Sequence, residues 1–246
     1  MVPGSVKVFA DAEAVSEAAA HEFVRAAGEA VAARGRFRAA LSGGSTPRRL
    51  YQLLAAPPYR DQIDWARTDL FWGDERAVPP DDPQSNYRMA RETLLDPARV
   101  PPANVVRWRS EDPDLDAAAR DYEASLTRGA SAPWLDLALL GLGPDGHTAS
   151  LFPGTSALAE DERLAVALDV AEMGTRRLTL TDPALCGARD VCFRATGPDK
   201  APALATVVEA RRLPAARIVR RAGPVTIFCD EAAARALAAP AADGRE

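Results

Sequence analysis

Histidine and cysteine are scarce in this chain of 246 residues, which contains two histidines and three cysteines. The cysteines, Cys186, Cys192 and Cys229, lie far apart and form no CxxC pair, so the spacing of a disulfide framework or a zinc site is absent. We interpret them as ordinary apolar residues of a protein from a reducing compartment. HExxH and paired-histidine patterns are also absent, and we therefore expect no metal and no other cofactor.

Long apolar runs and an excess of positive charge are missing as well. No apolar run approaches the ~20 residues that a membrane-spanning helix needs, and the first residues lack the pattern of a signal peptide. The net charge of −5 argues against the basic surface that general nucleic-acid binding requires. We therefore expect a cytoplasmic protein with no nucleic-acid or membrane partner, as a monomer or a weak homodimer.

Predicted strands and helices alternate along the chain, and hydrophobic residues, at 47%, suffice for a sizeable core. Strands are expected at Val6–Phe9, Phe37–Leu41, Asp69–Trp72, Val105–Trp108, Leu135–Leu140, Leu164–Val170, Arg177–Leu180, Val191–Ala195 and Val225–Cys229. Helices are expected from the Asp11 cap to about Ala33 and from the end of SGGSTP to Leu54. Further helices are expected over Ser85–Leu95, over Leu115–Leu126, from the end of TGPDK to Glu209, and over Glu231–Ala238. This order predicts a single α/β domain over residues 1–240, with a mostly parallel twisted sheet, helices on both faces and a frayed tail over residues 241–246.

A glycine-containing segment, Ser42–Pro47 (SGGSTP), joins a predicted strand to a predicted helix. Gly43 and Gly44 permit a sharp turn that exposes backbone N–H groups, and Ser45 and Thr46 add hydroxyls. Such a helix start binds anions, phosphate above all. An ordinary capped turn favours the same residue types, and the GK[ST] ending of a Walker A loop is missing.

The segment Gly73–Arg76 (GDER) follows the third predicted strand. It places Asp74 and Arg76 at a strand's carboxyl end, where α/β sheets present their ligands. An arginine there can hold a phosphate or carboxylate through two parallel hydrogen bonds. The alternative is a surface cluster of salt bridges that contributes little. Downstream, Pro83–Tyr87 (PQSNY) supplies polar side chains, among them Asn86.

The most informative stretch is Leu139–Gly154, LLGLGPDGHTASLFPG. Its glycines match GxGxxG, but Pro144 inside the turn and the PG pair at its end leave no long helix to receive a dinucleotide pyrophosphate. The turn presents His147 two residues after Asp145, and we favour a general base over a structural histidine. His21, within an alanine-rich helix, is interpreted as a bystander. No GxSxG elbow indicates a serine hydrolase.

Two cations lie at predicted strand ends in this acidic chain. Arg177 begins the RLTLT strand, and Lys200 follows an apolar strand within TGPDK. Each alone is more often a solvated charge, but together they can close over an anion held by a glycine loop. Arg176, beside Arg177, is an alternative for the same role.

These motifs together resemble one family, and the resemblance runs nearly from end to end. They occur in the family's order as SGGSTP (Ser42–Pro47), GDER (Gly73–Arg76), SNY (Ser85–Tyr87), GLGPDGHTASLFPG (Gly141–Gly154), RLTLT (Arg177–Thr181) and TGPDKA (Thr196–Ala201). The sequence resembles the 6-phosphogluconolactonases, and this resemblance implies a Rossmann-like fold of the sugar-phosphate isomerase/deaminase superfamily. The implied reaction is hydrolysis of 6-phospho-D-glucono-1,5-lactone to 6-phospho-D-gluconate in the oxidative pentose phosphate pathway.

The residues and the resemblance together define an expected site. The expected catalytic residues are His147, Asp145 and Asp74, and the expected substrate- and phosphate-binding residues are Ser42, Gly43, Gly44, Ser45, Thr46, Arg76, Asn86, Arg177 and Lys200. We expect neutral His147 to take a proton from the water that attacks the lactone carbonyl, with Asp145 orienting the imidazole. The phosphate anchors the far end of the sugar, and backbone N–H groups of the glycine turns receive the oxyanion.

Two alternatives stay open at this point. The superfamily includes glucosamine-6-phosphate deaminase, which shares the SGG loop and the DGH turn but continues with polar and acidic residues where this chain has Leu151 and Phe152. Its DE pair is typically followed by an aromatic residue, whereas Asp74 and Glu75 precede Arg76. Both differences favour the lactonase. A non-enzymatic sugar-phosphate sensor on the same scaffold is the other alternative.

Overall fold

Two sheets form the frame of the protein, for which a computed structural model describes residues 4–129, 132–171, 174–209 and 213–237. The larger sheet contains β1 (Gly4–Phe9), β9 (Val225–Asp230), β8 (Asp190–Ala195), β5 (Leu137–Gly141), β2 (Phe37–Leu41) and β3 (Thr68–Trp72), in that spatial order. All of its neighbouring strands run parallel. The smaller sheet contains β4 (Asp74–Arg76), β7 (Thr175–Leu180) and β6 (Ala165–Val170), all antiparallel.

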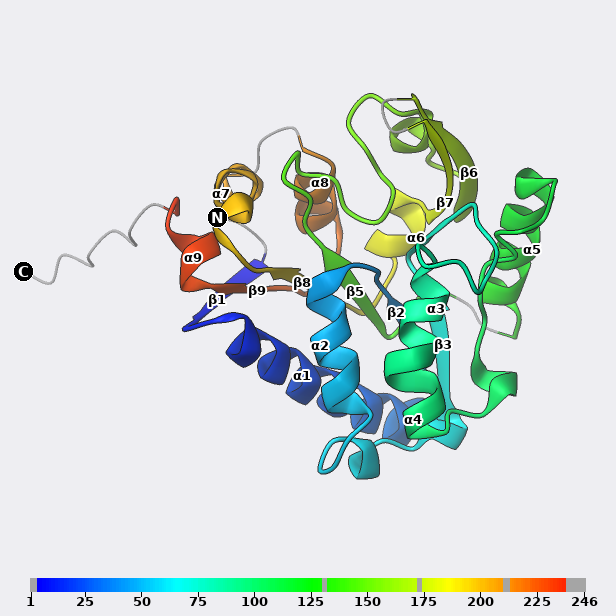
Figure 1. Cartoon of the computed structure of the whole chain (residues 1–246), viewed down its shortest axis with the longest axis horizontal. Helices are drawn as coiled ribbons and strands as arrows, with labels where there is room; N and C mark the ends of the chain where they lie inside the picture. Colours follow the sequence, from blue (N-terminus) through cyan, green and yellow to red (C-terminus); the bar gives the residue numbers. More distant parts are fainter. Residues whose placement is uncertain (1–3, 130–131, 172–173, 210–212, 238–246) are drawn as a thin grey trace, which may run out of the picture.

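The helices connect these strands and cover the larger sheet on both faces (Figure 1). They are α1 (Ala12–Arg34), α2 (Ser45–Leu54), α3 (Asn86–Ala90), α4 (Asp96–Ala98), α5 (Leu115–Thr127), α6 (Asp182–Cys186), α7 (Ala201–Val208), α8 (Pro214–Arg221) and α9 (Glu231–Ala234). A π-helical turn over residues 91–95 joins α3 to α4, and short 3₁₀ turns lie at residues 60–62, 65–67, 102–104, 156–159 and 198–200. No described helix is both long and apolar enough to cross a membrane.

The longest helix illustrates how local sequence sets an element's bounds. Asp11 caps α1 by accepting a hydrogen bond from the N–H of Ala14 at 2.9 Å. The helix ends at Arg34, and its C-cap Gly35 has a φ of 76°, in the left-handed region that glycine adopts at low cost. Between them, Phe23 and a row of alanines are buried, so the helix packs closely against the sheet.

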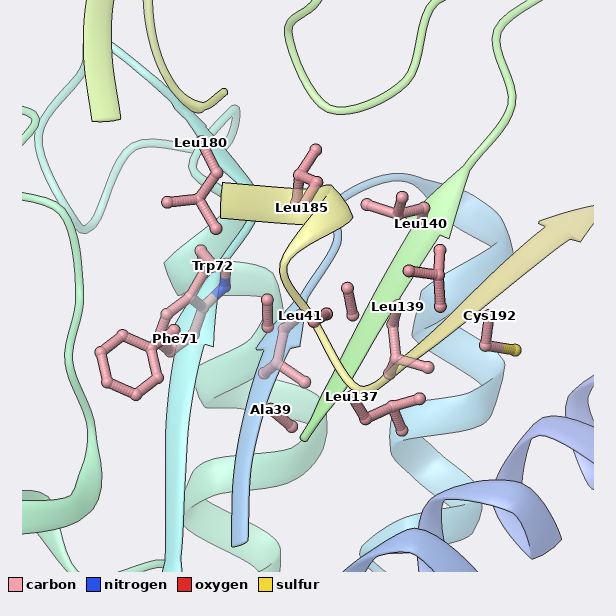
Figure 2. Packing of buried hydrophobic residues seen from close by; sticks show 14 of the residues in the cluster. Ala39, Leu41, Phe71, Trp72, Leu137, Leu139, Leu140, Leu180, Leu185 and Cys192 are labelled. Carbon is pink, nitrogen blue, oxygen red and sulfur yellow. The ribbon is translucent and has the colours of Figure 1, made fainter. Parts of the chain in front are cut away.

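One hydrophobic core extends through both sheets and their helices. Leu137 to Leu140 are all buried because β5 lies in the middle of the parallel sheet and is covered on both faces. Figure 2 shows Leu41, Leu139 and Trp72 from three neighbouring strands close to Leu180 of β7 and Leu185 of α6. The backbone continues this junction, since the Gly73 N–H donates to the Leu41 carbonyl and the Leu180 N–H donates to the Gly73 carbonyl, both at 2.8 Å.

The predicted fold class is confirmed, and most predicted elements are found within a few residues of their expected bounds. The prediction of a strand at Val105–Trp108 is wrong, because only Val105 forms an isolated bridge to β3. Side chains take the further pairing positions on β3: the Tyr122 hydroxyl accepts from the Trp72 N–H at 2.6 Å, and the Trp108 indole donates to the Trp72 carbonyl at 3.1 Å.

Other differences concern the smaller sheet and the ends of the chain. Asp74–Arg76 of GDER, predicted only to follow a strand, forms β4, and the strands predicted at 164–170 and 177–180 join it in the smaller antiparallel sheet. Helices α6 and α8 were not expected from the sequence. The last helix ends at Ala234 rather than Ala238, and both Ala238 and the tail predicted at 241–246 lie outside the described residues.

Candidate active site

A cavity of about 250 Å³ opens where the loops after β2, β3, β5 and β8 converge. The carboxyl ends of parallel strands meet at one edge of a sheet, which is why these loops lie together. The cavity is lined by Ser42, Gly43, Gly44, Thr46, Pro47, Asp74, Arg76, Asn86, Gly141, Leu142, Gly143, Pro144, His147, Thr148, Ala149, Arg194, Thr196 and Lys200. The motifs that are dispersed along the sequence therefore share one site.

The SGGSTP segment forms one wall of the cavity. Gly44, with φ 105°, is the N-cap of α2 and makes no side-chain cap hydrogen bond, so the first N–H groups of the helix have no capping side chain. Thr46 lies 3.1 Å, hydroxyl to hydroxyl, from Thr196 after β8, which ties the two loops together. Gly43 is packed so tightly that a Cβ there would lie 1.8 Å from Asn86 Oδ1. The side chain of Ser45 lies outside what the structure describes.

Ser42 is fixed from three sides at the base of this wall. Its backbone N–H donates to the Tyr51 hydroxyl at 2.9 Å, and that hydroxyl donates to the Ser42 carbonyl at 2.7 Å. Arg194, from β8, donates through Nη2 to Ser42 Oγ at 2.8 Å. Burial lowers the pKa of Arg194, which is only 2% exposed, but an arginine keeps its charge in proteins. Sequence reasoning missed this arginine, although a charged residue within the apolar run VCFRA is a signal.

The DGH turn holds its histidine against a carboxylate. His147 Nδ1 lies 2.5 Å from Asp145 Oδ1, and the His147 backbone N–H donates to the same oxygen at 3.2 Å. The imidazole also packs on Phe152, with ring centroids 4.4 Å apart. A Cβ on Gly143 would lie 2.1 Å from His147 Nδ1, so a glycine is needed beneath the ring.

The carboxylate of Asp145 stays ionised beside this ring. Partial burial acts to raise the pKa of Asp145, but the hydrogen bonds with the His147 ring and backbone outweigh it and leave the pKa lowered. Asp145 does not line the cavity, whereas His147 does. An imidazole whose Nδ1–H donates to a carboxylate carries its lone pair on Nε2, which makes that atom the candidate base.

Asp74 meets the cavity between the two sheets. Ser150 donates its hydroxyl to Asp74 Oδ2 at 2.6 Å, and Asn86 Nδ2 donates to the Asp74 carbonyl at 3.0 Å. Ala149 holds a φ of 47°, in the left-handed region that a non-glycine residue seldom adopts. The chain turns there immediately before Ser150. Sequence reasoning missed Ser150, because nothing in a lone serine signals a partner 76 residues away.

Glu75 turns away from the cavity and organises the loop that carries Asn86. Its carboxylate accepts the backbone N–H groups of Arg76, Asn86 and Tyr87, each at 2.8 Å, and the Ser85 hydroxyl at 3.1 Å. Burial raises the pKa of Glu75, although the backbone hydrogen bonds act against it. Glu75 is therefore a structural anchor for the start of α3.

Replacing Glu75 with glutamine should lower the free energy of unfolding by about 1–3 kcal/mol. An amide offers a single acceptor oxygen, and its own N–H₂ group would face donors. Urea unfolding would measure the change, with Glu92→Gln as the control, because Glu92 forms only an exposed pair with Arg88 at 2.7 Å. Equal stability of the two variants would contradict the anchoring role.

The cations predicted to bind phosphate take different positions. Arg76 and Lys200 line the cavity, and the Lys200 ammonium lies 3.1 Å from Asp199. Arg177 is paired directly opposite Arg76 across β4 and β7 but does not line the cavity. Burial lowers the pKa of Arg177, and the charge of Arg76 lowers it further. The alternative, Arg176, forms an ion pair with Asp169 at 3.2 Å.

Most of the predicted site residues converge on the cavity; Asp145 and Arg177 lie outside its lining, and Asn86 uses its amide N–H₂ within the protein. The N–H groups of Gly143 and Gly146 donate within their own turn, to the carbonyls of His147 and Gly143, so neither is the expected oxyanion donor. Among the described residues, no group of three or more His, Cys, Asp or Glu is arranged to hold a metal ion. His21, interpreted above as a bystander, does not line the cavity, and its Nε2 lies 3.2 Å from the Tyr59 hydroxyl.

The fold and the cavity define an α/β protein that presents a histidine–aspartate pair and several cations at the carboxyl edge of a parallel sheet. Residues 10–227 match the family described as glucosamine-6-phosphate isomerases/6-phosphogluconolactonase. The chain belongs to this family.

Individual relatives are similar over nearly the full chain. It is 40% identical over 243 residues to a 6-phosphogluconolactonase of Mycobacterium tuberculosis, covering 94% of this chain and 98% of the relative. A 6-phosphogluconolactonase of Synechocystis is 40% identical over 217 residues, covering 85% and 88%. The structure of the Trypanosoma brucei 6-phosphogluconolactonase superposes with a TM-score of 0.85 at 29% identity, covering 96% and 99%. A monomeric glucosamine-6-phosphate deaminase shares the fold, with a TM-score of 0.82 at 21% identity and coverage of 94% and 99%.

Proposed function

We propose that this protein hydrolyses 6-phospho-D-glucono-1,5-lactone to 6-phospho-D-gluconate. The observation that carries the proposal is that His147 lines the same cavity as Arg76, Lys200 and the start of α2. The naming of the relatives as 6-phosphogluconolactonases supports it. On this proposal the protein acts in the oxidative pentose phosphate pathway.

The phosphate is placed at the start of α2, beside Lys200 and Arg76. Uncapped N–H groups at a helix N-terminus favour an anion, and the two cations add charge-assisted contacts. Arg177, opposite Arg76 in the smaller sheet, adds positive potential from behind it. Binding energy from this end of the substrate holds the lactone carbonyl near His147.

Neutral His147 is the proposed base. As a water oxygen forms its bond to the lactone carbon, the water's proton moves to His147 Nε2, and ionised Asp145 stabilises the resulting imidazolium through Nδ1. The tetrahedral intermediate then breaks the bond between that carbon and the ring oxygen. The ring oxygen takes the proton from Nε2, which restores the neutral histidine. Asp74, held by Ser150, is proposed to position the substrate in the cavity.

The deaminase alternative is less consistent with the surroundings of His147. Phe152 packs on the imidazole, and Leu151 is fully buried, so these positions present no carboxylate for additional proton transfer. An assay on freshly prepared 6-phosphogluconolactone, which measures the acid released by hydrolysis, tests the proposal. Catalysed hydrolysis is expected. Release of ammonia from glucosamine 6-phosphate without lactone hydrolysis would overturn it.

Replacing Lys200 with alanine should raise KM for the phosphorylated lactone by about 10–30-fold, as loss of one charged hydrogen bond predicts. The KM for glucono-1,5-lactone, which has no phosphate, should change by less than about threefold. Steady-state kinetics on both lactones measures the difference. The chain contains one other lysine, Lys7, whose ammonium lies 5.6 Å from the centre of the Phe228 ring, and Lys7→Ala is the control. An equal rise in KM for both lactones would contradict the assignment of Lys200 to the phosphate site.

A further inference from the structure

Arg194 places a buried positive charge in the lining of the cavity, and no salt bridge to a carboxylate of the described residues balances it. Of its N–H groups, Nη2 donates to Ser42 Oγ, while Nε and Nη1 have no acceptor among the described residues. A buried charge without a partner is costly for a folded protein, and proteins retain such groups mainly at functional sites. Arg194 lines the cavity, so its surroundings there are open to a ligand.

The described residues supply no negatively charged partner for Arg194. The titratable side chains that interact most with Arg194 are Tyr51 and Cys192, and burial raises the pKa of each to about 12. Both are therefore neutral near pH 7, and no described carboxylate forms a salt bridge with Arg194. An anionic ligand in the cavity would provide the missing charge.

The contact with Ser42 also fixes the direction of a hydroxyl. A guanidinium can only donate, so Ser42 Oγ must accept from Nη2 and keeps its own proton for another acceptor. The two hydrogen bonds with Tyr51 immobilise the Ser42 backbone. Ser42 lines the cavity, and the result is a rigid, polarised donor beside the start of α2.

The hydrogen bond from Arg194 to Ser42 links two parts of the sheet that are not adjacent. In the strand order β8–β5–β2, the Arg194 side chain starts on β8 and reaches past β5 to the residue that follows β2. Arg194 lines the same cavity as His147 and Thr46, which lies at the start of α2.

We propose that Arg194 is a specificity-determining residue, whose buried charge and whose hold on the Ser42 hydroxyl select substrates that carry a phosphate dianion over uncharged sugar lactones. This inference rests on the proposed function for its substrate, but it concerns anion binding and can be measured without turnover. Arg194 acts partly through Ser42 and partly through its charge, so its effect adds to that of the other cationic residues that line the cavity, Arg76 and Lys200.

The test compares Arg194→Met and Arg194→Lys with the unmodified protein. Calorimetry with 6-phosphogluconate and with inorganic phosphate should give a Kd about 30-fold higher for Arg194→Met, with partial recovery in Arg194→Lys. KM for the phosphorylated lactone should rise by a similar factor, with kcat reduced by less than about threefold. The melting temperature of Arg194→Met should not fall, because an apolar side chain removes a buried unpaired charge.

Two further variants separate selection from a structural role. Arg38→Met removes a half-buried arginine at the opposite end of β2, where its guanidinium donates to the carbonyls of Trp134 and Leu126, both at 2.8 Å. It should lower the melting temperature and leave the Kd for phosphate unchanged. Ser42→Ala should weaken phosphate binding, and Arg194→Met should weaken it less in a Ser42→Ala background than alone.

Each outcome decides the inference independently of the proposed reaction. Unchanged Kd values in Arg194→Met, equal KM losses with phosphorylated and unphosphorylated lactone, or a lower melting temperature with unchanged binding would each overturn it. If the unmodified protein failed to hydrolyse the lactone but bound inorganic phosphate in an Arg194-dependent way, the proposed function would fall and the inference would stand. If Arg194→Met did not fold, the Arg194→Lys and Ser42→Ala affinities would decide.

Discussion

Replacing His147 with alanine is expected to lower kcat for the phosphorylated lactone by about 10²–10⁴-fold, the usual contribution of a general base. KM should change by less than about threefold, because the groups proposed to hold the phosphate lie on other loops. The structure gives the reason for a large effect: His147 is the only histidine lining the cavity among the described residues, and its Nδ1 is already engaged by Asp145.

The matched control is the second histidine of the chain. His21 lies on α1 and contacts the Tyr59 hydroxyl at 3.2 Å, outside the cavity, so His21→Ala should keep its turnover. Asp145→Asn should also lower kcat strongly, since the amide offers no negative charge to the imidazolium and can donate to Nδ1, which favours the wrong tautomer of the ring. If His147→Ala kept a kcat close to that of the unmodified protein, the assignment of His147 as the base would be wrong, whatever the results for the other variants.

The parts of the fold that were predictable are those with signals in a few consecutive residues. Phe37–Leu41 lies between Gly35, whose φ is 76°, and the glycine turn that follows Ser42. Its strand was predicted with the bounds that the structure has. The Asp11 cap predicted the start of α1 in the same way. In both cases the determining interactions are local, so no knowledge of the tertiary structure is required.

The place of β4 in the smaller sheet was not predictable by this reasoning, because its partner β7 is far away in the chain, whereas β6 and β7 are consecutive strands. GDER is too short to show a strand pattern, and it becomes β4 only because β7 lies beside it, about a hundred residues later in the chain. The failed strand at Val105–Trp108 has the reverse cause. Its residues favour a strand, but Tyr122 and Trp108 side chains occupy the hydrogen-bonding groups of Trp72 that further pairing would need.

The candidate site shows the same division. The glycine loops and the DGH turn can be recognised from residue types at fixed spacing. The order of strands then predicts that these loops lie together at one edge of the sheet. Ser150 and Arg194 act through single contacts with residues far away in the chain, at 2.6 Å and 2.8 Å. Such contacts depend on side-chain direction across strands, which a sequence without its tertiary structure does not specify.

Replacing Gly143 with alanine should lower kcat/KM by about 10²-fold or more, because a displacement of about 1 Å in a catalytic group has effects of that size. The added Cβ would lie 2.1 Å from His147 Nδ1 and 2.6 Å from Asp145 Oδ1, so the imidazole must leave its partner. The ring lies at the end of a flexible side chain and can move. The fold should therefore survive, with a loss of about 1–3 kcal/mol at most in unfolding free energy.

The neighbouring glycine provides a control within the same loop. A Cβ on Gly141 would meet nothing within 4 Å, and its φ is not positive, so Gly141→Ala should reduce kcat/KM far less than Gly143→Ala. Kinetics and thermal unfolding of both variants separate a displaced base from a misfolded loop. If Gly143→Ala kept the activity of Gly141→Ala, the contact between His147 and Asp145 would not matter for turnover. A selective loss in Gly143→Ala at similar stability would instead tie catalysis to the orientation of one imidazole, since the substitution adds a methyl group and removes no charged or proton-carrying group.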